Sequence, residues 1–291
     1  MKHHLLGVAV TIGSGLVAAR VATAEPLRQA DRVHDFHTVD RLTPQTTFGF
    51  ELGYEKWDSG GPFDPTILGF DVSGHYVSDQ GFGGYLVVPM AYVSTPDVVV
   101  GPLVIQGDSE VAIGNLELGG MYARQVDRRL DIVAHLGVAL PTADDTGPGA
   151  LQAFAAVPRY GDLAQRWINS SWLRLGVSPM GTAGPIFWRA DFGLDVMLTD
   201  DGGDGVDISP ILRLNVAGGV DLGPADVSVE LATNVVSNDD PNADDSASTF
   251  AIGARLDGQI QPGIALILPV GFDGLEDYLD LAVAFSLTGR M

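Results

Sequence analysis

The chain has 291 residues, of which 46% are hydrophobic and 18% are charged, and this composition excludes a disordered or collagen-like chain. Its 37 Asp and Glu against 16 Lys and Arg give a formal net charge of −21, which disfavours binding to the phosphate backbone of nucleic acids. The absence of cysteine excludes disulfide scaffolds, thiolate metal sites and cysteine nucleophiles.

The first 24 residues have the pattern of an export signal. A short basic start precedes an apolar run from Leu5 to Ala19, and Ala22-Thr23-Ala24 forms a small-x-small cleavage pattern before Glu25. We predict a signal peptide over residues 1–24, with a retained membrane anchor as the alternative. After Ala24, no uninterrupted apolar run reaches the roughly 18 to 20 residues that a spanning helix needs.

Most of the remaining chain alternates between apolar residues and polar or small ones. In the clearest segment, residues 186–198, every second residue is apolar, whereas Arg189, Asp191 and Asp195 occupy the other face. Such alternation is typical of a β-strand between two unlike environments. The same pattern predicts twelve strands, at residues 46–57, 68–78, 83–93, 111–124, 130–141, 172–179, 186–199, 208–220, 225–236, 249–259, 264–271 and 278–287. Each is near the roughly 9 to 11 residues that cross a bilayer at a tilt.

The predicted connections alternate between short and long along the chain. The short ones are residues 79–82, 125–129, 180–185, 221–224 and 260–263. The others, which are generally longer and rich in Asp, Gly and Pro, are residues 58–67, 94–110, 142–171, 200–207, 237–248 and 272–277. Short turns at one membrane surface and long loops at the other are typical of outer-membrane barrels.

Aromatic residues fall near the ends of the predicted strands, as in the aromatic girdles of such barrels. They are Tyr54, Trp57, Tyr76, Tyr85, Tyr92, Tyr122, Trp188 and Tyr278. On these patterns, the chain resembles a Gram-negative outer-membrane β-barrel protein of the porin or small-solute channel type, over about residues 46 to 291. Two features depart from that type. Such chains commonly end on an aromatic residue, whereas this one continues past Phe285 and Leu287 to Met291. In addition, Pro89 and Pro269 would each remove a hydrogen bond between neighbouring strands.

The resemblance implies an all-β, transmembrane, antiparallel up-and-down barrel of about 12 strands, with short periplasmic turns and longer acidic outer loops. Residues 25–45 would form a periplasmic N-terminal leader and residues 46–291 the barrel. The resemblance also implies a place in the bacterial outer membrane, contact with outer-membrane lipid and lipopolysaccharide, a small-molecule solute, and the barrel-assembly machinery as a partner during biogenesis. A soluble β-sandwich is the alternative, but its polar face would carry many Lys, Thr and Ser, whereas Lys56 is the only lysine after residue 24.

The alternation assigns polar side chains to the barrel lumen. The predicted lumen and selectivity residues are Arg174, Arg189, Arg213, Arg255, Asp191, Asp195, Glu51, Glu55, Asp71, Asp131, His75, His135, Glu117, Glu230, Asp257 and Asp280, together with Asn215 and Asn234. Sorted by strand, an acidic arc faces a basic arc, and such an arrangement predicts a transverse field across a narrow or partly occluded pore. In the alternative interpretation, these groups pair with one another and only satisfy a polar interior.

The longest predicted loop, residues 142–171, has a helix-like interior at residues 149–157. It is expected either to fold inward and narrow the lumen or to form a cap at the outer surface. In the first case its polar and aromatic residues would meet the solute, namely Arg159, Tyr160, Asp162, Arg166 and Trp167.

We predict no catalytic residue, no metal site and no cofactor. The acidic stretches 200–207 and 238–245 resemble calcium loops, but the first departs from the EF-hand pattern at Gly202 and at Ile211. They are interpreted as solvated acidic loops, with weak divalent-cation binding at the outer surface as the alternative. His34 and His37 lack a third metal ligand. The His-x-Ser spacing of outer-membrane phospholipases is missing after His75 and His135. The sequence therefore favours passive diffusion or binding of small solutes in a narrow pore. A closed structural or adhesive barrel and a lipid-modifying hydrolase are the alternatives.

Overall fold

The structure, a computed structural model, describes residues 34–57, 64–100, 103–143, 146–200, 210–236, 246–271, 279 and 281–291. The predicted signal peptide, Asp280 and most of the two acidic stretches lie outside the described residues. Within the described ranges, no helix is both long enough and apolar enough to cross a membrane.

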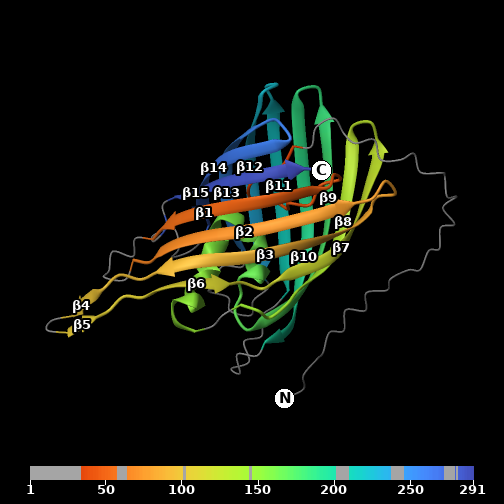
Figure 1. The fold of residues 1–291 in the computed structure, drawn as a ribbon. Coiled ribbons are helices and arrows are strands. Elements are labelled where there is room, and N and C mark those ends of the chain that lie inside the picture. The colour runs from red at the N-terminus through yellow and green to blue at the C-terminus, as the bar shows by residue number, and fades with distance from the viewer. Residues whose placement is uncertain are drawn as a thin grey trace, which may run out of the picture.

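The described chain consists of β-strands and one 3-10 helix, η1. Their bounds are β1 Thr47–Lys56, β2 Thr66–Val77, β3 Phe82–Ser94, β4 Val98–Val100, β5 Leu103–Ile105, β6 Ser109–Ile113, β7 Glu117–Asp127, β8 Leu130–Ala139, η1 Gly147–Gln165, β9 Ser170–Ala183, β10 Ile186–Asp200, β11 Ile211–Asp221, β12 Ala225–Val236, β13 Ser246–Leu256, β14 Ile260–Val270 and β15 Ala282–Arg290. The small β4–β5 hairpin extends away from the other strands (Figure 1).

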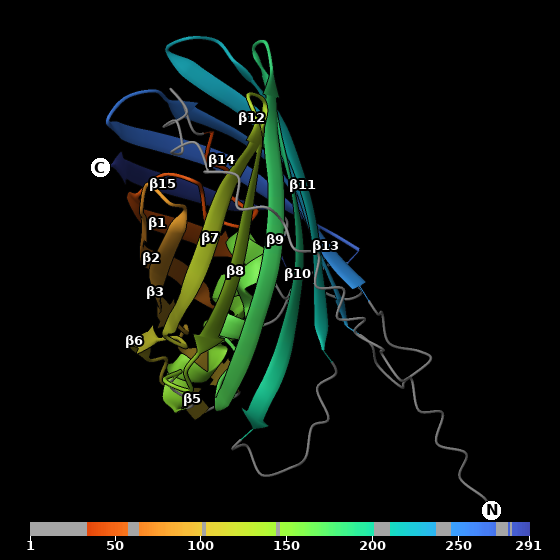
Figure 2. The ribbon, with the colours of Figure 1, turned by 90° about the vertical axis from the view of Figure 1, so that its right-hand side faces the viewer.

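Antiparallel pairing of neighbours closes the strands into a barrel (Figures 1 and 2). The closure is made by β1, which pairs with both β2 and β15, with Thr47 opposite Arg290. Twelve strands form the wall and β6 is an additional short strand beside β3. The predicted all-β, antiparallel barrel of about twelve strands is therefore confirmed.

One predicted strand is wrong, because residues 111–124 do not form a continuous strand. The wall here consists of β6 and β7, separated by residues 114–116. At the break, Gly114 donates its amide to the carbonyl of Pro89, and Asn115 donates its amide to the carbonyl of Gln165 in η1. The break faces Pro89, on either side of which β3 changes its partner from β7 to β6. A proline has no amide to donate, so continuous pairing is weakened at this point.

Several predicted boundaries also shift. β9 continues to Ala183, so its connection to β10 is the two-residue turn Gly184-Pro185 in place of residues 180–185. Gly184 has a φ of 65°, which glycine adopts without the steric cost of a Cβ. β15 runs from Ala282 to Arg290 where residues 278–287 were predicted, because pairing with β1 continues to the last four residues of the chain.

The two faces of the wall differ in the predicted way. Outward side chains are apolar and exposed on strand after strand, as Phe192, Val216 and Ile252 illustrate with exposures of 51%, 54% and 51%. The neighbouring inward positions are polar and buried, as at Asp191 and Asn215, both 2% exposed. An apolar exterior around a polar interior matches a barrel surrounded by hydrocarbon.

Connection length separates the two ends of the barrel. We call the end with the turns β2–β3, β7–β8, β9–β10, β11–β12 and β13–β14 the short-turn end, and the opposite end the long-loop end. The connection from β8 to β9 starts at the long-loop end, and its helix η1 lies within the barrel outline in both views (Figures 1 and 2).

Candidate functional site

The lumen is lined by buried polar side chains, and most of the predicted residues lie there. Glu55, Asp71, His75, Glu117, His135, Arg174, Arg189, Asp191, Asp195, Arg213, Asn215, Glu230, Asn234 and Arg255 are all buried. Glu51, Asp131 and Asp257 are half-buried, and Asp280 is outside the described residues. Their role in selectivity stays a prediction.

The wall carries an acidic side and a basic side, although the separation is partial. Glu51, Asp71 and Glu117 stand on β1, β2 and β7, which are contiguous through β3. Arg174, Arg189, Arg213 and Arg255 stand on β9, β10, β11 and β13, respectively. Carboxylates also occur on this basic side, and Asp195 accepts hydrogen bonds from Arg174 at 3.3 Å and from Arg213 at 3.1 Å.

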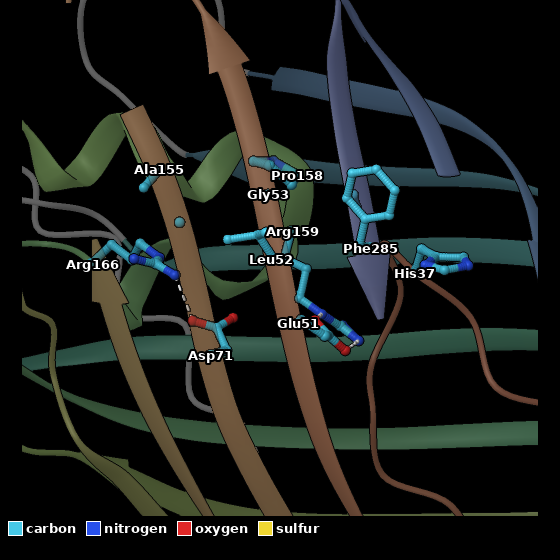
Figure 3. Close-up of a pocket in the computed structure, with 12 residues that line it drawn as sticks. His37, Glu51, Leu52, Gly53, Asp71, Ala155, Pro158, Arg159, Arg166 and Phe285 are labelled. Atoms are coloured by element: carbon cyan, nitrogen blue, oxygen red, sulfur yellow. Dashed lines mark hydrogen bonds and ion pairs between the residues drawn. The ribbon is translucent and has the colours of Figure 1, made fainter. Parts of the chain in front are cut away.

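Helix η1 enters the lumen and packs on the acidic side of the wall. Two wall glycines permit this approach, because a Cβ on Gly53 would lie 2.7 Å from Cγ of Pro158, and a Cβ on Gly69 would lie 3.1 Å from the carbonyl oxygen of Ala155 (Figure 3). Alanine at either position would force the helix or the wall to shift.

The arginines at the C-terminal half of this insertion bind the acidic wall. Arg159 donates to the Glu51 carboxylate and Arg166 donates to Asp71 (Figure 3). These are charge-assisted hydrogen bonds in a buried setting. The inward-folding interpretation of residues 142–171 is thus the one that the structure shows.

Asn115, at the break between β6 and β7, anchors the end of η1. Its side-chain amide donates to the carbonyls of Ala164 at 3.0 Å and Trp167 at 2.7 Å, and its side-chain oxygen accepts from the amide of Ala143 at 3.0 Å. The strand break therefore ties the insertion to the wall.

A second insertion, residues 34–45, fills the lumen from the short-turn end. It begins near the starts of β10 and β12, where His34 stacks on Phe187 at a ring-centroid distance of 3.8 Å and its Nδ1 lies 2.8 Å from an Asp226 oxygen. The segment then runs inward and turns back to Thr46, whose carbonyl accepts from the amide of Met291 at the same end. We call residues 34–45 the N-terminal segment.

Wall side chains hold the N-terminal segment along its length. Arg255 donates to Asp35 at 2.6 Å, and Glu230 accepts from the amides of His37 at 2.9 Å and Thr38 at 2.6 Å. The sequence had assigned this segment to a leader outside the barrel domain. The residues from His34 onward lie inside the barrel. The domain boundary between residues 45 and 46 stays a prediction.

The two insertions meet in the middle of the lumen. Arg41 of the N-terminal segment donates to Asp162 of η1 at 2.6 Å and to Asp71 of the wall at 3.1 Å. Asp162 also accepts from the wall residue Arg174 at 3.1 Å. The insertions therefore carry arginine to the acidic side of the wall and carboxylate to its basic side.

Burial and these ion pairs shift the pKa values of the inserted groups. Burial opposes ionisation of Asp35, but Arg255 and Arg159 outweigh it and lower the pKa of the carboxyl to about 2. Burial likewise opposes ionisation of Asp162, and Arg41 and Arg174 still hold its pKa well below the ordinary value. Burial, with Arg255 nearby, lowers the pKa of His37 to about 4, so that this imidazole is neutral at pH 7.

Two small spaces lie between the insertions and the wall in the described part of the chain. One cavity, of about 20 Å³, lies between η1 and strands β1, β2 and β15 and is lined by His37, Glu51 and Arg159, among others (Figure 3). Another, of about 10 Å³, is lined by Asp40 and His135, among others. Such volumes hold about one water molecule each.

Comparison with known proteins gives the fold. No protein-family model and no curated protein matches the chain. The crystal structure of the COG4313 outer membrane channel from Pseudomonas putida F1 matches with a TM-score of 0.61 and 12% identity, covering 89% of this chain and 99% of that one. The NanC porin structure matches with a TM-score of 0.53 and 10% identity, covering 84% of this chain and 100% of that one. The fold is that of outer-membrane channel barrels.

Within this channel-type barrel, the two predicted histidines contact the N-terminal segment. The Nε2 atom of His75 lies 3.1 Å from the Thr43 hydroxyl, and Nδ1 of His135 lies 3.4 Å from an Asp40 oxygen. No group of three or more His, Asp or Glu that could hold a metal ion occurs among the described residues. The absence of a metal site from the whole chain stays a prediction from the sequence.

Sequence reasoning missed part of the lumen, namely the N-terminal segment and Asn115. Asp35, Asp40 and Arg41 lie outside the alternating strands, so parity assigned them no face. The available signal was a dense run of charged and polar residues, His34 to Thr43, immediately before the first strand. Asn115 was hidden because it was placed inside a predicted strand.

Proposed function

We propose that the chain is a narrow channel for small solutes in the bacterial outer membrane, closed by η1 and the N-terminal segment and opened when the N-terminal segment leaves. In this proposal a signal peptide of residues 1–24 directs export, the short turns face the periplasm and the long loops face lipopolysaccharide. The channel fold supports the general class, and the filled lumen explains why an opening step is needed.

The observation that carries the proposal is the charge complementarity between the wall and the two insertions. Glu51 and Asp71 of the wall bind Arg159, Arg166 and Arg41, and Arg255 binds Asp35. A wall that served only as structure would be expected to pair its own charges, because an unpaired buried charge is costly. Asp195 does pair with Arg174 and Arg213 of the wall. Glu51, Asp71 and Arg255 instead take their counter-charges from the insertions, and the N-terminal segment supplies two of these, Arg41 and Asp35.

The N-terminal segment is the insertion better placed to move. Within the described residues it is continuous with the wall at Thr46, whereas η1 is joined to β8 and β9 at its two ends and held by Asn115. Leaving the lumen would expose Glu230 and Asp191 together with Arg189 and Arg255. Opposed charges in a low-dielectric wall would orient dipolar solutes.

A closed structural barrel without transport is the second candidate. The cavities of about 20 and 10 Å³ favour it, since neither forms a passage for a solute. The two candidates differ in whether the segment leaves under conditions that keep the barrel folded.

Conductance across a planar bilayer decides between them. We expect the wild-type protein to open rarely and the double variant Asp35→Ala/Arg41→Ala to open more often, because it loses the pairs with Arg255, Asp71 and Asp162. Arg128→Ala in the exposed β7–β8 turn is the control and should behave as wild type. If the double variant is folded, as judged by circular dichroism, but carries no current across the bilayer, the result would favour the structural barrel.

A further inference from the structure

We infer that the short-turn half of the lumen is a binding site for an oligopeptide without regular secondary structure, and that the N-terminal segment is its resident occupant. The inference rests on the proposed channel function, since it names the class of solute that the opened lumen would take. It is argued from the way in which the segment is held, which depends largely on main-chain atoms.

Buried acceptors of the wall bind amide groups of the segment. The Glu230 carboxylate accepts from the amides of His37 and Thr38, at 2.9 and 2.6 Å, and Asp191 accepts from the amide of Asp40 at 2.9 Å. Both carboxylates are at most 2% exposed. Charge-assisted hydrogen bonds of this kind hold a peptide whatever its side chains are.

Glu230 shows this dependence most clearly. Its other hydrogen-bond partners in the described chain are two hydroxyls, those of Thr38 and Ser228. A buried carboxylate without a bonded arginine or lysine needs amide or hydroxyl donors to offset its desolvation. On this wall those donors come mainly from the peptide in the lumen.

Arginines bind carbonyl groups of the same stretch. Arg189 donates to the carbonyl of Leu42 at 2.9 Å, and Arg159 of η1 donates to the carbonyl of Val39 at 2.6 Å. Residues 37–42 thus use three amides and two carbonyls, so both kinds of main-chain group are recognised. An ion or a simple sugar lacks this succession of donors and acceptors, whereas every oligopeptide has it.

The wall also selects side chains at a few positions. Phe36 and Val39 pack in an apolar recess with Phe187 and Ala217. Asp71 receives a cation from the segment, namely Arg41. The preferred ligand is therefore an oligopeptide with two apolar residues three apart and a basic residue shortly after them.

The test uses the full-length double variant Asp35→Ala/Arg41→Ala, whose own segment is weakly held and whose wall is intact. A labelled peptide with the sequence of residues 34–45 is titrated into the folded variant in detergent, and binding is followed by fluorescence anisotropy. The same peptide N-methylated at His37 and Thr38 lacks both amide donors to Glu230. We expect it to bind at least about tenfold more weakly, the size expected for losing hydrogen bonds to a charged group.

Two further peptides separate main-chain recognition from side-chain recognition. In one, Asp35→Ser, Asp40→Ser and Arg41→Ser remove the ion pairs, and the other is its N-methylated form. We expect the substituted peptide to bind and N-methylation to weaken it by a similar factor. On the protein, Glu230→Gln should weaken peptide binding. The inward-facing control Thr249→Val should not, because the Thr249 hydroxyl has no hydrogen-bond partner among the described residues.

Binding and conductance are measured on the same preparation, so the two proposals can fail separately. If N-methylation has no effect, or if only the native sequence binds, the oligopeptide site is refuted even when the variant conducts. If the variant binds peptides but never conducts, the channel function fails and the peptide site stands. Peptide added at the periplasmic side should block the current of a conducting variant.

Discussion

Arg41 and Asp162 form an ion pair with a distance of 2.6 Å between Nη2 and Oδ2, although 121 residues separate them in sequence. Arg41 belongs to the segment that enters from the short-turn end, and Asp162 belongs to the helix that enters from the long-loop end. The two insertions therefore close the lumen jointly, and each stabilises the other where they meet.

Breaking this pair should open the channel. We expect Arg41→Met and Asp162→Asn each to raise the open probability in planar bilayers, because either substitution leaves a buried charge with fewer partners. Removing one partner of a fully buried ion pair destabilises a structure, here the closed state, by about 3 to 5 kcal/mol. The double variant should show less than the sum of the two single effects, since both remove the same contact. Strictly additive effects would show that the two insertions are not coupled.

Ion selectivity should depend on the basic side of the wall. In the background Asp35→Ala/Arg41→Ala, we expect Arg213→Glu to move the reversal potential towards cation selectivity, because it places a second carboxylate beside Asp195. Arg189→Glu should act in the same direction. Arg124→Glu, on the exposed face of β7, is the charge-matched control. An unchanged reversal potential in both lumen variants would refute the transverse field.

The closed state should weaken on mild acidification because of His37. Its pKa falls from the ordinary 6.5 to about 4 when the segment is seated, so the released segment binds more protons between these values. The seated state is therefore favoured above pH 6.5 and loses stability as the pH falls towards 4, by on the order of 3 kcal/mol in total. Open probability should rise over this range.

The variant His37→Gln isolates this effect, because other groups of the lumen also titrate. It should show a smaller rise in open probability between pH 6.5 and pH 4 than wild type. Asp35 acts differently, because its pKa falls from the ordinary 3.8 to about 2 when the segment is in the lumen. Its stabilisation of the closed state is therefore lost only as the pH falls from 3.8 through 2. Identical pH profiles for wild type and variant would remove His37 from this role.

Gly69 of β2 should be needed for η1 to pack against the wall. Gly69→Val is expected to destabilise the protein by roughly 1 to 3 kcal/mol, because its side chain would overlap Ala155. Gly74→Val, on the outward face of the same strand, is the control, since a Cβ there makes ordinary contacts of 3.6 and 4.0 Å. Urea unfolding in detergent compares the two. Equal destabilisation would indicate a general strand effect and not a specific contact with η1.

The sequence by itself determined the barrel and the identity of most wall residues. A strand between hydrocarbon and a polar interior must alternate with a period of two, so Asp191 or Phe192 can be assigned to a face without any tertiary information. Connection lengths then gave the topology. The arginines and acids of residues 159–166 were also visible as groups that would enter the lumen if the loop folded inward.

Only the tertiary structure decided where the chain leaves that pattern. The break at residues 114–116 depends on contacts of Asn115 with Gln165 and Trp167, about 50 residues away, which no local periodicity encodes. The seat of the N-terminal segment depends on partners as distant as Thr288, which donates to Asp35 across 253 residues. A segment without regular secondary structure is placed by complementary charge and main-chain hydrogen bonds, and these exist only after the barrel has closed around it.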